Sequence, residues 1–316
     1  MNLSLPDFEA ARARIAGQVR VTPVIAWDPM EIAARVTLKL EHLQIGGSFK
    51  VRGALSRLLV EEPARLARGV VTASGGNHGI GVAYAAARVG AKAVVFLPES
   101  APAATERRLA TLGAEAIRGG RAWDDAWLAA LDHAERTGAL AVHPFEDPLV
   151  IAGQGTVGLE LLDQAPDLDA VLVAIGGGGL IAGVAASIHA RAPGVRVVGV
   201  EPEGAASMSV SLRAGRVTPL DEVRTIAGTL APRSVGPNTL AIVTREAVEV
   251  VLVSDDELRA AMRRLWDDLR ILVEPAGAAA VAALLSGRAP LGDARHVAIL
   301  VCGANLDATL AAEVVS

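Results

Sequence analysis

The chain alternates between short runs of consecutive apolar residues and longer segments with apolar residues at helical spacing. Short apolar runs bounded by polar or glycine-containing turns are typical of strands in a sheet that is covered on both faces. Segments with an apolar residue every three or four positions predict amphipathic helices. The pattern predicts strands at residues 36–40, 69–73, 92–97, 114–117, 140–143, 170–175, 195–200, 248–253 and 296–301, with a short extended piece at 21–25.

The predicted helices lie between these strands, apart from one that opens the chain. They cover residues 6–19, 50–60, 77–89, 102–112, 124–137, 148–164, 179–192, 204–214, 254–269 and 275–285. Asp147 before Pro148 is a candidate N-cap, and Ser254 with Glu257 forms a candidate capping box. Residues 215–239 have no regular pattern and predict a long loop with short turns. Strands alternating with helices predict an α/β fold with mostly parallel, doubly wound sheets and helices on both faces.

Composition limits the possible classes of protein. A chain of 316 residues, 52% hydrophobic, can bury a large core in one unit or two lobes. It has no apolar run of about 18 residues, which argues against a membrane span. The net charge of −5 is spread along the chain without a basic stripe, which argues against nucleic acid as a partner. One cysteine and the lack of a signal-peptide pattern favour the cytoplasm.

Lys50 stands where a predicted helix begins, after an apolar strand and a Gly-Gly loop. The partial positive charge of a helix N-terminus disfavours an ammonium group and favours the neutral, nucleophilic amine. Such an amine is suited to forming an imine with an aldehyde. Most lysines are solvated surface residues, so the position alone leaves both interpretations open.

Four consecutive glycines, Gly176 to Gly179, follow a predicted strand and open a helix. Their backbone N–H groups can surround an anion at the positive end of that helix, or the glycines can simply form a tight packing turn. The pattern Gly177-x-Gly179-x-x-Ala182, with Glu201 at the end of the next strand, also fits a dinucleotide fingerprint. A nicotinamide- or flavin-dependent oxidoreductase is therefore an alternative, although the loop lies in mid-chain and this interpretation leaves Lys50 unexplained.

A second polar loop, Ser74-Gly75-Gly76-Asn77-His78, lies between a strand and a helix. Its N–H groups can hold a carboxylate, or Asn77 can act as an N-cap in a glycine-rich turn.

Two further candidates stand at ends of predicted elements. Cys302 ends the last strand, where ligands of α/β proteins collect, although free cysteines are commonly just buried. Glu274 precedes Pro275 and is either a site residue or an N-cap. Six scattered histidines and the single cysteine predict no zinc site.

The segment Gly-Ser-Phe-Lys-x-Arg-Gly-Ala at residues 47–54 resembles the cofactor-lysine motif of the pyridoxal-phosphate enzymes of fold type II. It is most similar to the branch of serine/threonine dehydratases and serine racemases. Further stretches agree in order and spacing, so that the resemblance covers nearly the whole chain. They are residues 72–79, 143–144, 151–156, 176–180, 273–275 and 301–307.

The resemblance implies two lobes, a smaller one at residues 66–146 inserted into a larger one at 1–65 and 147–316. It implies pyridoxal 5′-phosphate held as an imine by Lys50, which also removes the α-proton, and an assembly as a homodimer. The cofactor would be held by Phe49, Lys50, Asn77, Gly176, Gly177, Gly178, Gly179, Leu180, Glu274 and Cys302. The substrate would be bound by Ser74, Gly75, Asn77 and His78.

The reaction implied is a β-elimination that converts a 3-hydroxy amino acid such as L-threonine or L-serine to a 2-oxo acid and ammonia. Racemisation or β-replacement on the same fold is an alternative, as is a cofactor-binding protein without turnover.

Four departures from the family's pattern bear on that expectation. Serine racemases carry a second serine at the position of Gly75, which argues against racemisation. Many dehydratases carry an aspartate at the position of Gly228, so a bulkier 3-hydroxy amino acid stays open. The cation site of some relatives needs a second acid near Glu201 that this chain lacks, which predicts a weak site or none. After Ser316 there is no room for a regulatory domain.

Overall fold

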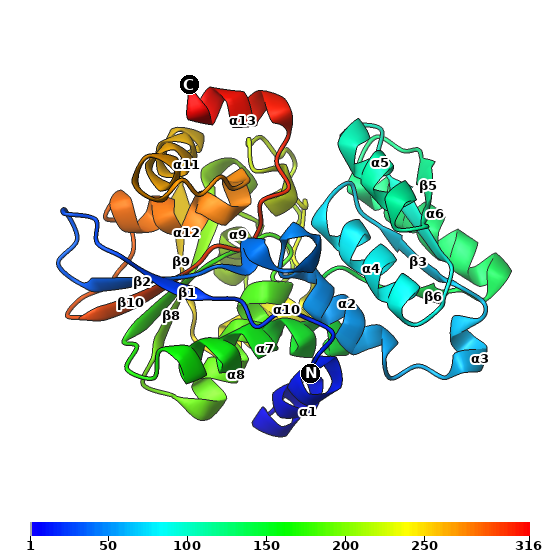
Figure 1. Cartoon of the computed structure of the whole chain (residues 1–316), viewed down its shortest axis with the longest axis horizontal. Coiled ribbons are helices and arrows are strands. Elements are labelled where there is room, and N and C mark those ends of the chain that lie inside the picture. The colour runs from blue at the N-terminus through cyan, green and yellow to red at the C-terminus, as the bar shows by residue number, and fades with distance from the viewer. Residues whose placement is uncertain (1) are drawn as a thin grey trace.

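The computed structural model describes residues 2–316 and contains two sheets, which lie beside one another in Figure 1. The larger sheet has the order β1 (Val24–Trp27), β2 (Arg35–Lys39), β10 (His296–Leu300), β7 (Ala170–Ala174), β8 (Arg196–Pro202) and β9 (Glu249–Val253). The smaller has the order β5 (Glu115–Arg118), β4 (Ala93–Leu97), β3 (Val70–Ala73) and β6 (Leu140–Ala141). Neighbouring strands are parallel except for the antiparallel pair β1 and β2.

Helices cover both faces of each sheet. In Figure 1, α7 and α8 lie on one side of the larger sheet and α11 and α12 on the other. The smaller sheet lies between α6 and the pair α4 and α5. The helices are α1 (Leu5–Ile15), α2 (Lys50–Leu58), α3 (Pro63–Leu66), α4 (Asn77–Arg88), α5 (Ala103–Thr111), α6 (Trp123–Thr137), α7 (Pro148–Gln164), α8 (Gly179–Arg191), α9 (Ser207–Ala214), α10 (Pro237–Arg245), α11 (Asp255–Leu269), α12 (Pro275–Leu285) and α13 (Ala308–Val315). Short 3₁₀ helices are η1 (Glu41–Leu43), η2 (Ile45–Gly47), η3 (Glu203–Ala205) and η4 (Gly228–Leu230). The predicted α/β class is confirmed.

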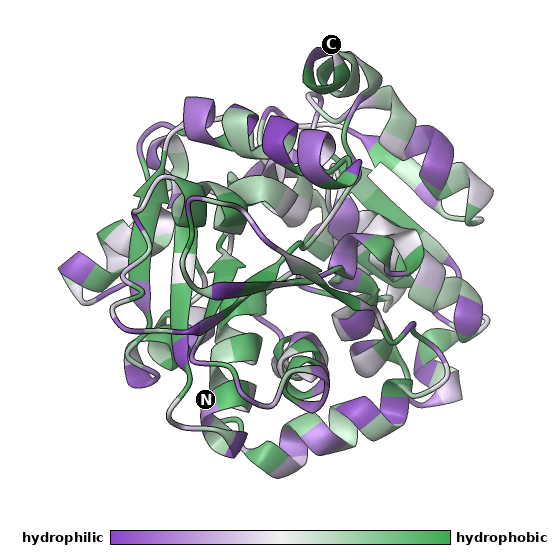
Figure 2. Cartoon of the chain, turned by 60° about the vertical axis from the view of Figure 1, so that its left-hand side comes forward, coloured by the Kyte–Doolittle hydropathy of each residue, from purple (hydrophilic) through white to green (hydrophobic). Residues whose placement is uncertain are grey.

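Hydropathy follows burial as the sequence pattern predicts. The strand ribbons are mostly hydrophobic in Figure 2, whereas the outer helices alternate between hydrophilic and hydrophobic residues. Every residue of β7 is buried. Glycines bring α7 and α8 together, because a methyl group on Gly183 would lie 2.4 Å from the carbonyl oxygen of Ile151. Close backbone approach of this kind explains why these central helices are rich in small residues.

The helix α2, which begins with Lys50, packs between the two sheets. Its side chains Val51, Leu55 and Leu58 belong to the apolar cluster that also contains Val70 of β3. The strands of the smaller sheet all come from residues 70–141, and those of the larger sheet come from either side of that segment. The lobe boundaries at 66 and 146 stay a prediction.

The local signals at helix starts are confirmed in two places. The Asp147 side chain accepts from the N–H groups of Leu149 and Val150, and Ser254 and Glu257 form the capping box of α11.

The loop predicted at 215–239 contains a short turn, η4, as expected, but its end is wrong, because residues 237–239 begin α10. That helix begins with Pro237 and has Gly236 as its N-cap, so no capping side chain marked its start. The helices α3 and α13 were also not predicted. No helix in the described part of the chain is long and apolar enough to cross a membrane.

Candidate active site

A cavity of about 1240 Å³ opens at the carboxyl ends of β3, β4, β7 and β10. Carboxyl ends of parallel strands are the usual place for ligands in α/β folds. Every site residue expected from the sequence lines this one cavity: Phe49, Lys50, Ser74, Gly75, Asn77, His78, Gly176, Gly177, Gly178, Gly179, Leu180, Glu274 and Cys302. Segments separated by more than two hundred residues in sequence are thereby brought together.

Lys50 is the first residue of α2, as expected, and its side chain enters the cavity. The Nζ atom donates a hydrogen bond to the Pro144 carbonyl oxygen at 2.9 Å. Burial lowers the pKa of Lys50 to about 8, against the opposing influence of Cys302 and Glu274. The direction agrees with the sequence interpretation, but loss of water is the physical cause rather than the helix N-terminus alone. The neutral fraction of this amine near pH 7 is therefore much larger than that of an ordinary lysine, whose pKa is about 10.4.

The glycine loop fits closely against its neighbours. Gly178 has a φ of +93°, which side-chain-bearing residues rarely adopt. A methyl group on Gly177 would lie 2.2 Å from Cδ1 of Phe145, so Phe145 packs directly on the loop. Within residues 2–316, the N–H groups of Gly176, Gly177 and Gly178 donate to no backbone acceptor. Together with the start of α8 they form a cradle of free donors suited to an anion.

Asn77 holds a central position in the second polar loop. Its Nδ2 donates to Glu274 Oε1 at 2.6 Å, and its Oδ1 accepts from Asn305 Nδ2 at 2.6 Å. The N-cap of α4 is Gly76, without a side-chain bond, so the interpretation of Asn77 as a capping residue is wrong. The side chain instead connects the polar loop with residues that follow β10 and precede α12.

Two histidines near Lys50 are held neutral. Burial, helped by the positive charge of Lys50, lowers the pKa of His143 to about 4 and that of His78 well below its usual range. His78 Nε2 contacts the Val142 carbonyl oxygen at 3.2 Å. The His143 Nδ1 atom accepts from the N–H groups of Phe145 and Glu146, which fits an unprotonated nitrogen.

Glu274 and Cys302 are buried residues that line the cavity. Glu274 stands at the N-cap position of α12, but its side chain makes no capping bond and faces Asn77 instead. Burial raises the pKa of Glu274 to about 7, against the hydrogen bond from Asn77. Burial also raises the pKa of the Cys302 thiol, whose Sγ donates to the Ala276 carbonyl oxygen at 3.3 Å. The thiol therefore stays neutral.

Several cavity residues were not predicted as site residues. Pro144, Phe145, Thr229 and Asn305 lie in or beside stretches that sequence analysis noticed, but nothing in their spacing showed that they meet at the cavity.

An aromatic cluster forms one wall of the cavity. Trp123, at the start of α6, donates from Nε1 to the Ala73 carbonyl oxygen at 2.9 Å. The His143 ring lies 4.6 Å from Phe145 and 4.9 Å from Trp127, centroid to centroid. Trp123 and Phe145 both line the cavity. Aromatic residues make up only 3% of this chain, and three of the nine, Trp123, Trp127 and Phe145, meet in this cluster.

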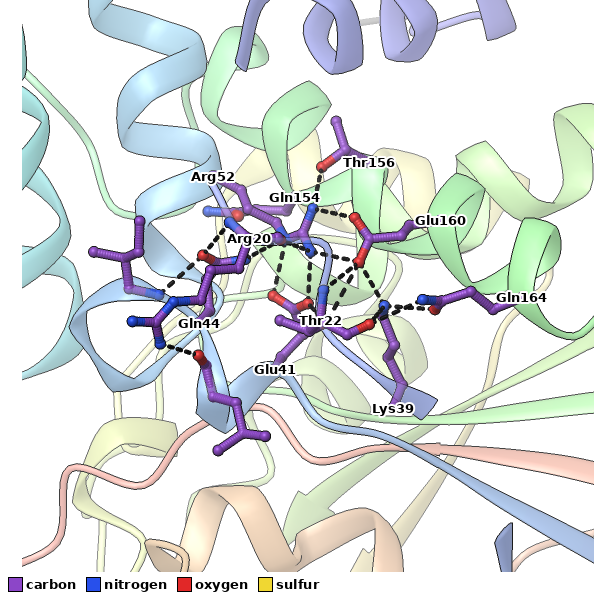
Figure 3. A network of polar contacts seen from close by, with 12 residues as sticks. Arg20, Thr22, Lys39, Glu41, Gln44, Arg52, Gln154, Thr156, Glu160 and Gln164 are labelled. Atoms are coloured by element: carbon purple, nitrogen blue, oxygen red, sulfur yellow. Dashed lines mark hydrogen bonds and ion pairs between the residues drawn. The ribbon is translucent and has the colours of Figure 1, made fainter. Parts of the chain in front are cut away.

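A buried ionic network is centred on Arg52, two residues after Lys50 in sequence (Figure 3). Arg52 donates to both oxygens of Glu41, at 2.8 and 2.7 Å, and to both oxygens of Glu160, each at 3.0 Å. Lys39 completes the network through Glu160. Two cations and two anions therefore balance one another in the interior. The network connects β2, the segment before Lys50, and the helices α2 and α7.

Glu201 does not serve the dinucleotide interpretation. Its carboxylate is buried and accepts from the N–H groups of Met208 and Ser209 at 2.7 and 2.9 Å, and from the Ser209 hydroxyl at 2.7 Å. Burial raises the pKa of Glu201 to about 7. The acid that would bind a ribose is thus already bonded to the first turn of α9. The described residues hold no group of three histidine, cysteine or acidic side chains arranged for a metal ion, and the weak or absent cation site stays a prediction.

Comparison with known proteins identifies the family. Residues 15–303 match the family of pyridoxal-phosphate dependent enzymes. The chain belongs to this family. An L-threonine ammonia-lyase of Geobacter sulfurreducens is 43% identical over 95% of this chain and 75% of its own length. A phenylserine dehydratase of Ralstonia pickettii is 41% identical over 96% of this chain and 95% of its own. The structure of maize serine racemase superposes with a TM-score of 0.94 at 34% identity, covering 99% and 97% of the two chains.

The cavity of this pyridoxal-phosphate enzyme fits the cofactor. The cradle of free N–H groups at Gly176 to Gly178 suits a phosphate, and a side chain on Gly177 would push into Phe145. Lys50 supplies an amine of lowered pKa on the same cavity. The oxidoreductase alternative is wrong, because the family is that of pyridoxal-phosphate enzymes and Glu201 is not free for a ribose.

Proposed function

We propose that this enzyme dehydrates and deaminates a 3-hydroxy amino acid, such as L-threonine or L-serine, to a 2-oxo acid and ammonia. The observation that carries the proposal is the placement of the Lys50 amine, with its pKa lowered to about 8, in one cavity with the glycine cradle and the Ser74 loop. L-Threonine ammonia-lyases and a phenylserine dehydratase among the relatives support it.

The residues proposed to hold the cofactor divide by the part that each would contact. Gly176 to Gly179, with Leu180, would hold the phosphate, and Lys50 would bond to the aldehyde. Asn77 would meet the ring hydroxyl, and the neutral Cys302 thiol would face the pyridine nitrogen. Phe49 and Glu274 would complete the surroundings. When bound, pyridoxal phosphate supplies an electron-withdrawing group at the substrate's α-carbon.

The substrate's carboxylate would be bound by Ser74, Gly75, Asn77 and His78, at the start of α4. Asn77 and His78 are the first two residues of that helix, whose positive end favours an anion. The neutral form of Lys50 removes the α-proton as a general base, for which its pKa of about 8 is well suited.

Serine racemases carry a second serine at the position of Gly75. This chain has no such group there to act as a second base. A side chain on Gly75 would begin 3.1 Å from Cβ of Ala101 and 3.5 Å from the Pro98 ring. The crowding supports elimination over racemisation.

A larger 3-substituent is the second candidate, in the form of 3-phenylserine. A methyl group on Gly228 would have no heavy atom within 4 Å, so the cavity is open where this residue lines it. The aromatic wall of Trp123 and Phe145 offers contacts to a phenyl ring. The phenylserine dehydratase relative supports this substrate class.

The test is to purify the protein and assay 2-oxo acid and ammonia with L-serine, L-threonine, threo-3-phenylserine and 3-hydroxyaspartate. We expect a visible absorbance band from the lysine-bound cofactor, absent in Lys50→Ala, and 2-oxo acid from at least one substrate. A band without any 2-oxo acid would contradict elimination and leave β-replacement or racemisation on the same fold. The ratio of kcat/KM for phenylserine and threonine decides between the two substrate classes.

We also propose that the enzyme works in the cytoplasm as a homodimer. The single, buried cysteine fits a reducing compartment. Light scattering on the purified protein tests the dimer, because a mass close to that of one chain would contradict it.

A further inference from the structure

Thr239 lies directly behind the glycine loop. It is the third residue of α10, its side chain is completely buried, and it is not among the described residues that line the cavity. The glycines from Gly176 to Gly179 do line the cavity. A methyl group on Gly178 would lie 2.8 Å from Thr239 Cβ, so these two residues are in direct contact. The loop therefore separates Thr239 from the space that the cofactor is proposed to fill.

The Thr239 hydroxyl has one hydrogen and two carbonyl oxygens within reach, those of Gly177 at 3.0 Å and Gly236 at 2.9 Å. The Gly236 oxygen already accepts from the Leu240 N–H group at 2.9 Å. No backbone N–H group of the described residues donates to the Gly177 oxygen. The Gly236 N–H group donates to the hydroxyl oxygen at 3.1 Å and so helps to orient it. Because a buried carbonyl without a partner is costly, the hydroxyl hydrogen is best used on Gly177.

This hydrogen bond fixes the direction of one peptide group. The peptide between Gly177 and Gly178 is trans, so its carbonyl oxygen and its N–H group point in opposite directions. With the oxygen held towards Thr239, the Gly178 N–H group points away from Thr239, to the side of the loop that faces the cavity. This N–H group is one of the free donors of the cradle.

Two consecutive glycines allow this peptide to turn over. Gly178 has a φ of +93°, and rotation of the peptide would bring it to negative φ, the region that any residue adopts. Neither glycine carries a Cβ atom that would resist the rotation. In the rotated state a carbonyl oxygen instead of an N–H group would face the anion and repel it. The direction of the peptide therefore has to be fixed from outside the loop, and the Thr239 hydroxyl is placed to do so.

The start of α10 is itself held in place relative to the loop. The Asn238 N–H group donates to Glu146 Oε1 at 2.6 Å, and Asn238 Nδ2 donates to the Glu146 carbonyl oxygen at 3.3 Å. The preceding residue, Phe145, packs against Gly177, where an added methyl group would lie 2.2 Å from its Cδ1. One short segment thus supports the loop through Phe145 and the helix that carries Thr239 through Glu146.

We propose that Thr239 is a positioning residue for the cofactor: its hydroxyl holds the Gly177 carbonyl and so directs the Gly178 N–H group at the phosphate. The inference rests on the proposed placement of the phosphate in the glycine loop, and it adds a residue that lies outside that loop. Thr239 acts through the peptide and does not itself contact the cofactor. A hydrogen bond to a charged phosphate oxygen is stronger than one between neutral groups, so a lost direction is measurable as lost affinity.

The deciding experiment compares two ligands in Thr239→Val, which keeps the size of the side chain and removes the hydroxyl. Pyridoxal phosphate carries the phosphate, whereas 5′-deoxypyridoxal has the same ring and aldehyde without it. Titration of the cofactor-free protein, followed by its visible absorbance, gives the affinity for each. We expect Thr239→Val to bind pyridoxal phosphate about tenfold more weakly, because a hydrogen bond to a charged group is lost. It should bind 5′-deoxypyridoxal as the wild type does, and Thr239→Ser, which keeps the hydroxyl, should bind both ligands normally.

Thr244→Val is the matched control. Thr244 lies on the same helix, and its hydroxyl donates to the Leu240 carbonyl oxygen at 2.8 Å, but it is not among the described residues that line the cavity. This variant should leave both affinities unchanged. The measurement with 5′-deoxypyridoxal also shows whether Thr239→Val has kept its fold, because the reaction with Lys50 requires an intact cavity.

A second measurement observes the phosphate itself. The ³¹P resonance of the bound cofactor depends on the donors around the phosphate. It should therefore differ between the wild type and Thr239→Val, and stay in place in Thr244→Val.

Four results would each overturn the role of Thr239 while leaving the proposed function intact. They are an equal loss of affinity for both ligands in Thr239→Val, no loss for pyridoxal phosphate, a Thr239→Ser variant as weak as Thr239→Val, and an unchanged ³¹P resonance. Wild-type protein that binds the two ligands equally tightly would overturn the placement of the phosphate in the glycine loop, and the role of Thr239 with it.

Discussion

The Asn305 side chain donates from Nδ2 to Asn77 Oδ1 at 2.6 Å and to the Gly46 carbonyl oxygen at 2.7 Å. One amide thus connects the segment after β10 with the polar loop at the start of α4 and with the turn that precedes Lys50. A methyl group on Gly47 would lie 2.7 Å from Asn305 Oδ1, so the turn fits closely around this amide. Asn305 fixes the orientation of Asn77, because Asn77 must accept from it while donating to Glu274.

We expect Asn305→Ala to weaken the binding of pyridoxal phosphate about five- to tenfold, since a lost hydrogen bond costs about 1 kcal/mol. The measurement is a titration of the cofactor-free protein, followed by its visible absorbance. Asn238→Ala is the matched control, because the Asn238 side chain donates to the Glu146 carbonyl oxygen at 3.3 Å and Asn238 is not among the described residues that line the cavity. Equal affinity in Asn305→Ala and wild type would show that Asn77 keeps its orientation without this amide.

The fold class was predicted from local patterns, whereas the set of site residues was implied by the resemblance of short motifs to a known family. Apolar runs at strand spacing, the glycines at 176–179 and the lysine at a helix start are each visible in a few consecutive residues. Asn305 was missed as a site residue because its role depends on a contact with Asn77, which lies far away in sequence. The helix α10 was missed because it begins with Gly236 and Pro237, a pair that also begins turns.

Replacement of Arg52 should destabilise the protein strongly. Arg52→Met leaves Glu41 and Glu160 buried with only Lys39 as a counter-charge, and breaking a buried pair in this way costs about 3–5 kcal/mol. Urea unfolding of the cofactor-free protein measures the change.

Two further variants make the Arg52 experiment decisive. Arg136→Met breaks an exposed pair with Asp132, in which both side chains are 66% accessible, and should cost less than about 1 kcal/mol. Adding Glu41→Gln to Arg52→Met restores the charge balance and should recover part of the loss. Similar costs for Arg52→Met and Arg136→Met would mean that the network adds no more than a surface pair.

The reaction of Lys50 with pyridoxal phosphate should depend on pH with a midpoint near 8. The neutral amine is the reactive form, so in the cofactor-free protein the rate should rise up to a pH of about 8 and then level off. With an ordinary lysine, whose pKa is about 10.4, the rate would continue to rise about tenfold per pH unit above pH 8. Stopped-flow absorbance gives the rate, and N-acetyl-lysine amide measured in parallel corrects for the titration of pyridoxal phosphate itself. A protein rate that parallels the free amine up to pH 10 would contradict the lowered pKa.

Gly178→Ala should impair both stability and cofactor binding, through a backbone cost and a steric clash. Gly215→Ala, which has the backbone cost without the clash, separates these two causes. Both glycines have positive φ, +93° and +66°, so each alanine carries a backbone cost of about 1–2 kcal/mol. At Gly215 the added methyl meets no atom within 4 Å, whereas at Gly178 it would lie 2.8 Å from Thr239 Cβ and 2.9 Å from Met208 Cε. We therefore expect Gly215→Ala to unfold at a lower urea concentration but to bind pyridoxal phosphate as the wild type does. Gly178→Ala should lose more stability and also bind pyridoxal phosphate at least about tenfold more weakly, which corresponds to 1.4 kcal/mol. If both variants kept the wild-type affinity, the fit of Gly178 against Thr239 and Met208 would have no part in shaping the phosphate cradle.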